Sequence, residues 1–114
     1  MAYKVHVAAS AEREYAEAMA YLAQQSASPR VLCSLADAFD AAVDALTANP
    51  YAYPIDTGMS KAVGREIRKI AVQRYLLRYF VDSVGHEVRV YSMLHMRQDV
   101  RRRFPIDFAE AEWS

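Results

Sequence analysis

The hydrophobic pattern of this chain changes its period once, and that change restricts the folds open to it. Between residues 28 and 49 the apolar side chains recur every three or four positions, at Leu32, Leu35, Phe39, Ala42, Val43 and Leu46. Ser28-Pro29 is typical of a helix start and Asn49-Pro50 of a helix end. After residue 65 the pattern alternates, which indicates strands. Helices followed by strands predict an α+β fold.

A second helix is predicted before this one. Ser10 stands where an N-cap would, with Glu12 and Glu14 in the first turn, where negative charge favours the helix dipole. One apolar stripe follows, at Ala11, Tyr15, Ala18, Met19 and Leu22. Because the connection to the next helix is short, the two helices are expected to form an antiparallel hairpin.

Four segments have the alternation or composition of strands: Tyr3–Val7, Arg65–Val72, Arg74–Asp82 and Glu87–Leu94. Pro54, Gly58 and Gly64 predict a loop over Tyr51–Gly64. The expected order is β-α-α-β-β-β, with the helical hairpin packed on one face of a small antiparallel sheet and the other face open. Residues 1–114 are expected to form a single domain, with a helical turn at Asp99–Phe104 and a tail from about residue 105.

The net charge of zero conceals an uneven distribution. Residues 1–60 hold three basic and seven acidic side chains, whereas residues 61–103 hold eleven basic and four acidic ones. The last eleven residues add three acidic side chains. A segment with a net charge of +7 is expected to attract phosphates or carboxylates, which is an argument about partners and not about the fold.

The basic side chains suggest one candidate site. It comprises Arg65, Arg68, Lys69 and Arg78 on the strands, and His95, Arg97 and Arg101 at or after the last strand. Guanidinium groups match phosphate oxygens, and a histidine can act as a general acid or base near neutral pH. A hairpin would bring these segments close together, so that their basic side chains would create one region of positive electrostatic potential. The alternative is that the charges only solvate an exposed sheet and its tail.

Several other classes of function are excluded or disfavoured. The three glycines are too scattered for a phosphate-binding loop, and one cysteine with three dispersed histidines disfavours a metal site. No cofactor is therefore expected. A single cysteine, Cys33, allows no internal disulfide, and the chain has no apolar stretch of membrane-spanning length. These features predict a cytoplasmic protein without membrane attachment.

Several segments together resemble the RelE/ParE superfamily of bacterial type II toxin–antitoxin toxins. They are Tyr3–Val7, Ser10–Glu14 with Tyr21-Leu22, Leu46–Pro50, Arg65–Ile70, Arg74–Asp82 and Leu94–Asp99. Their order and spacing cover nearly the whole chain. The resemblance implies a helical hairpin on an antiparallel sheet, a role in growth inhibition and plasmid stabilisation, and a cognate antitoxin that neutralises the toxin. It leaves a homodimer open.

The resemblance implies two targets. RelE-like toxins are mRNA interferases that cut mRNA in the ribosomal A site, and Arg97 falls at an arginine that these endoribonucleases use. His95 would then be an acid or base, and the basic strand residues with Arg101 would bind substrate. Another arginine of these enzymes falls near Leu76, with Arg78 two residues on, and their C-terminal tyrosine is absent from residues 101–104. ParE-like toxins instead inhibit DNA gyrase without catalysis.

Three readings therefore stay open. The chain is an enzyme that cleaves mRNA, a non-catalytic gyrase inhibitor, or a degenerate toxin that only binds an antitoxin or dimerises. In each of them an acidic or amphipathic antitoxin segment is expected on the positive sheet.

Overall fold

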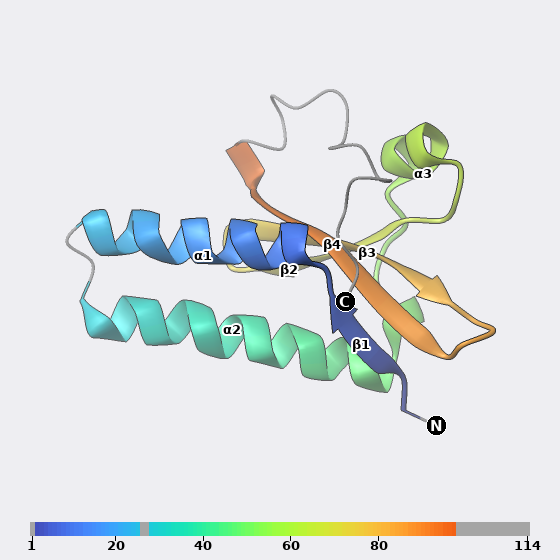
Figure 1. Ribbon diagram of the computed structural model, residues 1–114, viewed down its shortest axis with the longest axis horizontal. Helices are drawn as coiled ribbons and strands as arrows, with labels where there is room; N and C mark the ends of the chain where they lie inside the picture. The colour runs from blue at the N-terminus through green and yellow to red at the C-terminus, as the bar shows by residue number, and fades with distance from the viewer. Residues whose placement is uncertain (1, 26–27, 98–114) are drawn as a thin grey trace.

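The protein is an α+β domain in which two long helices lie on one face of a four-stranded sheet (Figure 1). The computed structural model describes residues 2–25 and 28–97. The strands are β1 (Lys4–Val7), β2 (Arg68–Val72), β3 (Tyr75–Asp82) and β4 (Glu87–His95). The helices are α1 (Ala9–Gln24), α2 (Pro29–Ala48), the 3₁₀ turn η1 (Pro50–Ala52) and α3 (Thr57–Val63). The predicted fold class is confirmed, while the turn at 99–104 and the tail lie outside the described residues.

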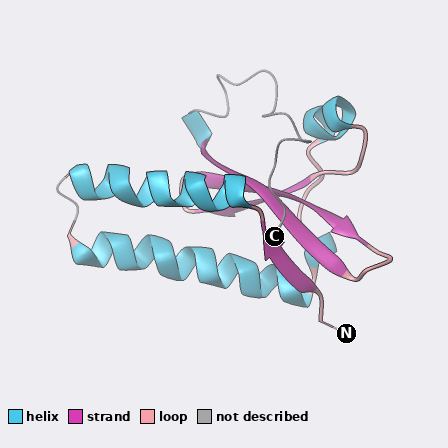
Figure 2. Ribbon diagram, in the orientation of Figure 1, coloured by secondary structure: helices cyan, strands magenta, loops and turns pink. Residues whose placement is uncertain are grey.

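The sheet is mixed, which corrects the expectation of an antiparallel one (Figure 2). Its strand order is β1-β4-β3-β2. The two hairpin pairs are antiparallel, but β1 runs parallel to β4, with Lys4 opposite Glu87 and Val7 opposite Val90. The prediction failed because the helical hairpin returns the chain to its starting end, so β1 and β4 enter the sheet in the same direction.

The main core lies between the sheet and the two long helices. The alternating residues Tyr75, Leu77 and Tyr79 of β3 all belong to it. From the helices come the fully buried Leu35 and Leu46. Burial of a large aliphatic side chain contributes about 1.5–3 kcal/mol, so this interface dominates the stability of the domain. The apolar residues whose spacing predicted the helices and strands are thus largely the residues that these elements bury in the core.

Helix α1 begins one residue before its predicted N-cap. Ala8 donates its N–H to the Val90 carbonyl, continuing the strand pairing, and itself becomes the N-cap. Ser10 therefore lies inside the helix, where its hydroxyl donates to the Tyr91 carbonyl at 2.8 Å. Tyr91 is the extra residue of a β-bulge, because Tyr79 pairs with Val90 and Arg78 with Ser92. Ser10 thus joins α1 to the bulge.

Helix α3 lies within the segment that was predicted to be a loop, so that prediction was wrong. Asp56 caps the helix by accepting the Met59 N–H at 3.0 Å, and Gly64 ends it with φ of 78°. Met59 and Val63 pack on Ile67 and on other buried side chains of the second sheet face. This face is thus covered in part and not open. No helix among the described residues is long and apolar enough to cross a membrane.

Candidate functional site

A buried ion pair lies between β3 and α3. Arg78 points to the second sheet face and is 5% exposed, and its Nε donates to Asp56 Oδ2 at 2.8 Å. The same carboxylate caps α3 through its other oxygen. A guanidinium removed from water requires such a partner, since an unpaired buried charge is strongly destabilising. The Asp56–Arg78 pair therefore fastens α3 to the sheet.

The lowered pKa of Asp56 agrees with its role as the charged partner of Arg78. Burial alone would raise its pKa, but the Met59 N–H, the hydrogen bond and charge of Arg78, and the charge of Lys69 together hold the pKa below its ordinary value. Asp56 is thus a carboxylate at neutral pH. The pair carries no net charge and is bonded internally.

Arg68 points to the opposite face of the sheet. It lies opposite Tyr79, a residue of the main core, whereas Lys69 lies opposite Arg78. Its guanidinium donates to the Tyr53 carbonyl at 2.6 Å and contacts the Glu66 carboxylate at 3.0 Å. Because side chains alternate along a strand, Arg68 and Arg78 are separated by the sheet itself. The expected convergence of these two arginines is not observed.

Arg65 is also engaged within the molecule, although its residue is exposed. Its guanidinium carbon lies 3.9 Å from the centroid of the Phe80 ring, and it donates to the Val81 carbonyl at 3.4 Å. A cation over an aromatic ring stabilises the local structure by about 0.5–1 kcal/mol at an exposed site. Arg65 and Arg78 therefore hold the second face and its flanking segments together, whereas Arg68 bonds to residues on the other face.

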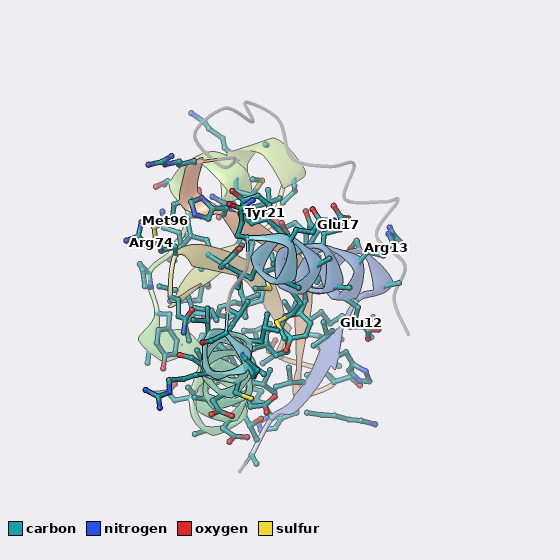
Figure 3. All side chains as sticks on the ribbon, turned by 90° about the vertical axis from the view of Figure 1, so that its left-hand side faces the viewer. Glu12, Arg13, Glu17, Tyr21, Arg74 and Met96 are labelled. Carbon is teal, nitrogen blue, oxygen red and sulfur yellow. The ribbon has the colours of Figure 1, made fainter. Side chains whose placement is uncertain are left out.

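A groove of about 790 Å³ lies elsewhere, between α1 and the ends of β3 and β4. We call it the α1–β4 groove. Its α1 side includes Arg13, Glu14, Glu17 and Tyr21, and its sheet side includes Arg74, Tyr75, Met93, Leu94, His95 and Arg97. Figure 3 shows Arg13, Glu17 and Tyr21 in a row along α1, as their spacing of four residues requires. Arg74 and Tyr21 belong to opposite sides of the same groove.

Both sides of the groove are held by hydrogen bonds. The Met93 N–H donates to Glu14 Oε1 at 3.0 Å, which fixes α1 beside β4. The Arg97 N–H donates to His95 Nδ1 at 3.1 Å, so neutral His95 carries its proton on Nε2. The Tyr75 ring packs edge-on against the His95 ring. Burial raises the pKa of Tyr75, with a smaller contribution from Tyr21, so Tyr75 stays a neutral phenol.

Residues 5–100 match the family model described as ParE toxin of type II toxin-antitoxin system, parDE. The chain belongs to this ParE toxin family. No curated protein matches the sequence. The resemblance to the RelE/ParE superfamily is thereby confirmed, and this ParE toxin has an antitoxin as its partner.

The predicted site residues of this ParE toxin fall into separate places. His95 and Arg97 meet in the α1–β4 groove, whereas Arg68, Lys69 and Arg78 lie on β2 and β3. Arg65 lies in the bend before β2, which begins at Arg68 and not at Arg65 as predicted. Arg101 lies outside the described residues. The roles assigned to all seven remain predictions. Among the described residues no group of His, Cys, Asp and Glu is arranged to hold a metal ion.

The sequence did not indicate the residues that pair with these arginines or that line the groove opposite them. Asp56 was counted only as an acidic residue, although an Asp eight positions before a Gly is typical of a short capped helix. Glu17 was counted only as an acidic residue, and Tyr21 was expected to pack in the core or the helical hairpin, whereas it is 58% exposed. Their spacing of four residues could have indicated a common face, but the strand opposite that face depends on the tertiary fold.

Proposed function

We propose that this ParE-family toxin inhibits growth by binding DNA gyrase and not by cleaving mRNA. The observation that carries the proposal is the buried Asp56–Arg78 pair. Arg78 is the strand arginine nearest to the position at which RelE-like enzymes hold a phosphate. In this toxin its guanidinium is 5% exposed and bonded to a carboxylate, which leaves it poorly placed to stabilise charge on a substrate.

The His95 ring supports the same proposal. A general base needs an unprotonated ring nitrogen that faces the substrate. In neutral His95 the unprotonated nitrogen, Nδ1, accepts the Arg97 backbone N–H. Glu14 and Glu17 line the same groove together with Arg13, Arg74 and Arg97, and this mixture of signs is a poorer match for a uniformly negative phosphodiester backbone than an all-basic groove would be. The groove is therefore better suited to a protein surface than to RNA.

The direct test is a DNA supercoiling assay with gyrase run beside a translation assay, both with purified toxin. The toxin should inhibit supercoiling or produce cleaved DNA at concentrations that leave translation unchanged. mRNA cleavage in the translation assay with intact gyrase activity would refute the proposal. Growth arrest on expression without antitoxin excludes the degenerate toxin.

The mRNA endoribonuclease remains a second candidate, because the groove brings His95 and Arg97 together. The substitution His95→Asn distinguishes between the two candidate functions. The asparagine Oδ1 can replace Nδ1 as acceptor for the Arg97 N–H, but the side chain cannot exchange protons. A binding toxin should keep its toxicity in this variant, whereas a nuclease that uses His95 should lose it.

A further inference from the structure

We propose that the outer edge of β1 is the contact of a symmetric dimer, in which β1 of one toxin pairs antiparallel with β1 of a second copy. The sheets of the two copies then continue into each other. The proposal gives a surface to the homodimer that the sequence left open. It does not depend on whether gyrase or the ribosome is the target.

The first argument is that the backbone of β1 is open on its outer side. β1 is the first strand in the order of the sheet, so it has a neighbour on one side only (Figure 1). The Lys4 N–H donates to the His86 carbonyl at 3.1 Å, and the Ala8 N–H also donates to β4, at 2.8 Å. Because donors alternate along a strand in a parallel pair, the N–H and C=O groups of Val5 and Val7 point away from β4. Within the described part of the chain these outward groups have no hydrogen-bond partner.

Two other stretches of strand edge, by contrast, are bonded to neighbouring segments. The Lys69 N–H on the outer side of β2 donates to the Pro54 carbonyl at 3.1 Å. The part of β4 that extends beyond β1 is bonded to α1 through Ser10 and Glu14. Covering an edge in this way prevents it from pairing with another strand. No described segment covers β1 in the same way, so its edge remains a template for a further strand.

The second argument is that this edge is complementary to itself. In an antiparallel pair with a two-fold axis at His6, Val5 of each copy lies opposite Val7 of the other, and their outward N–H and C=O groups pair with one another. Lys4 lies opposite Ala8, so the register places no lysine against a like charge. Because the same surface is used on both copies, the association stops at a dimer.

The charges beside β1 also suit a second copy. His6 Nε2 lies 3.4 Å from the Glu87 carboxylate, and Arg89 contacts the same carboxylate at 3.1 Å. These contacts offset the charges within each copy, so that two copies can approach without strong repulsion. A nucleic acid has a uniformly negative backbone and meets Glu87 as well as the basic side chains here. The edge therefore fits a protein strand.

The third argument concerns the two ends of the edge. Tyr51 is 43% exposed beside the start of β1, and its ring centroid lies 6.0 Å from that of Tyr3. In the proposed register Tyr3 of one copy lies opposite Ala9 of the other, where α1 begins. The register therefore brings this aromatic pair toward the first turn of α1 in the second copy. Tyrosine is among the residues that contribute most to protein interfaces, and the two-fold axis repeats the contact at the other end.

The oligomeric state of the purified toxin tests the proposal. Sedimentation velocity at several micromolar concentrations should show a monomer–dimer equilibrium and no larger species. Val5→Pro removes an outward N–H that the monomer does not use, and should weaken dimerisation about tenfold or more because the two-fold axis loses the bond twice. Val5→Ala is the matched control: it shortens the same side chain but keeps the N–H, and should change the dimerisation constant less than about threefold. A monomer at every concentration, a larger species, or a dimer that Val5→Pro leaves unchanged would overturn the proposal.

A second pair of variants tests the register. His6→Lys places two permanent positive charges opposite each other at the two-fold axis, and like charges directly opposite on neighbouring strands are destabilising. This variant should dimerise about tenfold more weakly than His6→Gln, which has a neutral side chain at the same position. Equal dimerisation of the two variants would show that His6 does not face its copy, and would refute the proposed contact.

Hydrogen exchange on the wild-type toxin, followed by NMR, covers the case in which a variant fails to fold. The Lys4 and His6 amides face β4 and should be protected at any concentration of toxin. The Val5 and Val7 amides should exchange quickly in dilute solution and more slowly as the concentration rises, because only the dimer gives them a partner. Exchange of Val5 and Val7 that is independent of concentration would exclude pairing at this edge.

Discussion

The second sheet face and the α1–β4 groove use the same kinds of side chain for different purposes. On the second face, Arg78 is 5% exposed and paired with Asp56, and Arg65 lies over the Phe80 ring. In the groove, Arg74 and Arg97 are exposed beside Glu17 and Tyr21. The difference comes from the segment 51–64, which supplies a carboxylate and a helix to one region and nothing to the other. Whether one of these arginines is bonded within the protein or exposed to solvent thus depends on whether the segment 51–64 packs against it.

The largest effect is expected where the buried pair is broken. Asp56→Ala leaves the Arg78 guanidinium without its carboxylate and removes the cap of α3, and should lower the free energy of unfolding by about 3–5 kcal/mol. Urea denaturation followed by circular dichroism measures this. Glu66→Ala is the control, because this carboxylate contacts Arg68 from a side chain that is 53% exposed, and its loss should cost less than about 1 kcal/mol. Equal effects would remove the distinction between structural and surface pairs.

The pH dependence of stability sharpens the same comparison. Because the pKa of Asp56 is lower in the folded protein than its ordinary value of about 3.8, the unfolded chain binds this proton more readily. The stabilisation is fully present above about pH 4 and is lost as the pH falls through the folded pKa. Unfolding curves from pH 6 to pH 3 should show a steeper loss for the wild type than for Asp56→Asn. Parallel curves would show that Asp56 does not supply this dependence.

Arg68→Ala should have an intermediate effect. The substitution removes charge-assisted hydrogen bonds to backbone carbonyls, each worth about 1.5–3 kcal/mol, but partial access of water reduces the net cost to about 1–2 kcal/mol. Thermal unfolding measures the change. Arg68→Lys is the control for charge, and it should recover only part of the loss because lysine lacks the forked donor geometry.

The smallest effect on stability is expected in the groove. Arg97→Ala and Arg74→Ala should each change the free energy of unfolding by less than about 0.5 kcal/mol, because these side chains are exposed. A loss of stability comparable with that of Asp56→Ala would place these arginines with the structural ones and contradict the comparison.

The helices and the hairpin strands could be predicted because their signals are local. The period of Leu35 and Leu46 and the alternation of Tyr75, Leu77 and Tyr79 directly reflect the face that each element buries. Helix α3 was missed because Pro54, Gly58 and Gly64 were taken to indicate a loop, although the two caps of the helix, Asp56 and Gly64, are also local signals.

The parallel pairing of β1 and the roles of the arginines could not be read in this way. Both depend on contacts between distant segments, such as Asp56 with Arg78 or Ser10 with Tyr91. For the same reason a positively charged segment indicated a partner without showing which of its arginines the fold itself uses. His95 and Arg97 were found together because they are neighbours in the sequence.

The parallel pairing of the first strand with the last one affects how the toxin is made. A ribosome releases β1 first, but Lys4–Val7 have no partner until Glu87–Val90 have also emerged. The sheet therefore closes only after β4 has been synthesised, and contacts between such distant segments slow folding. A chain terminated before β4 would lack both the strand that receives β1 and one side of the groove.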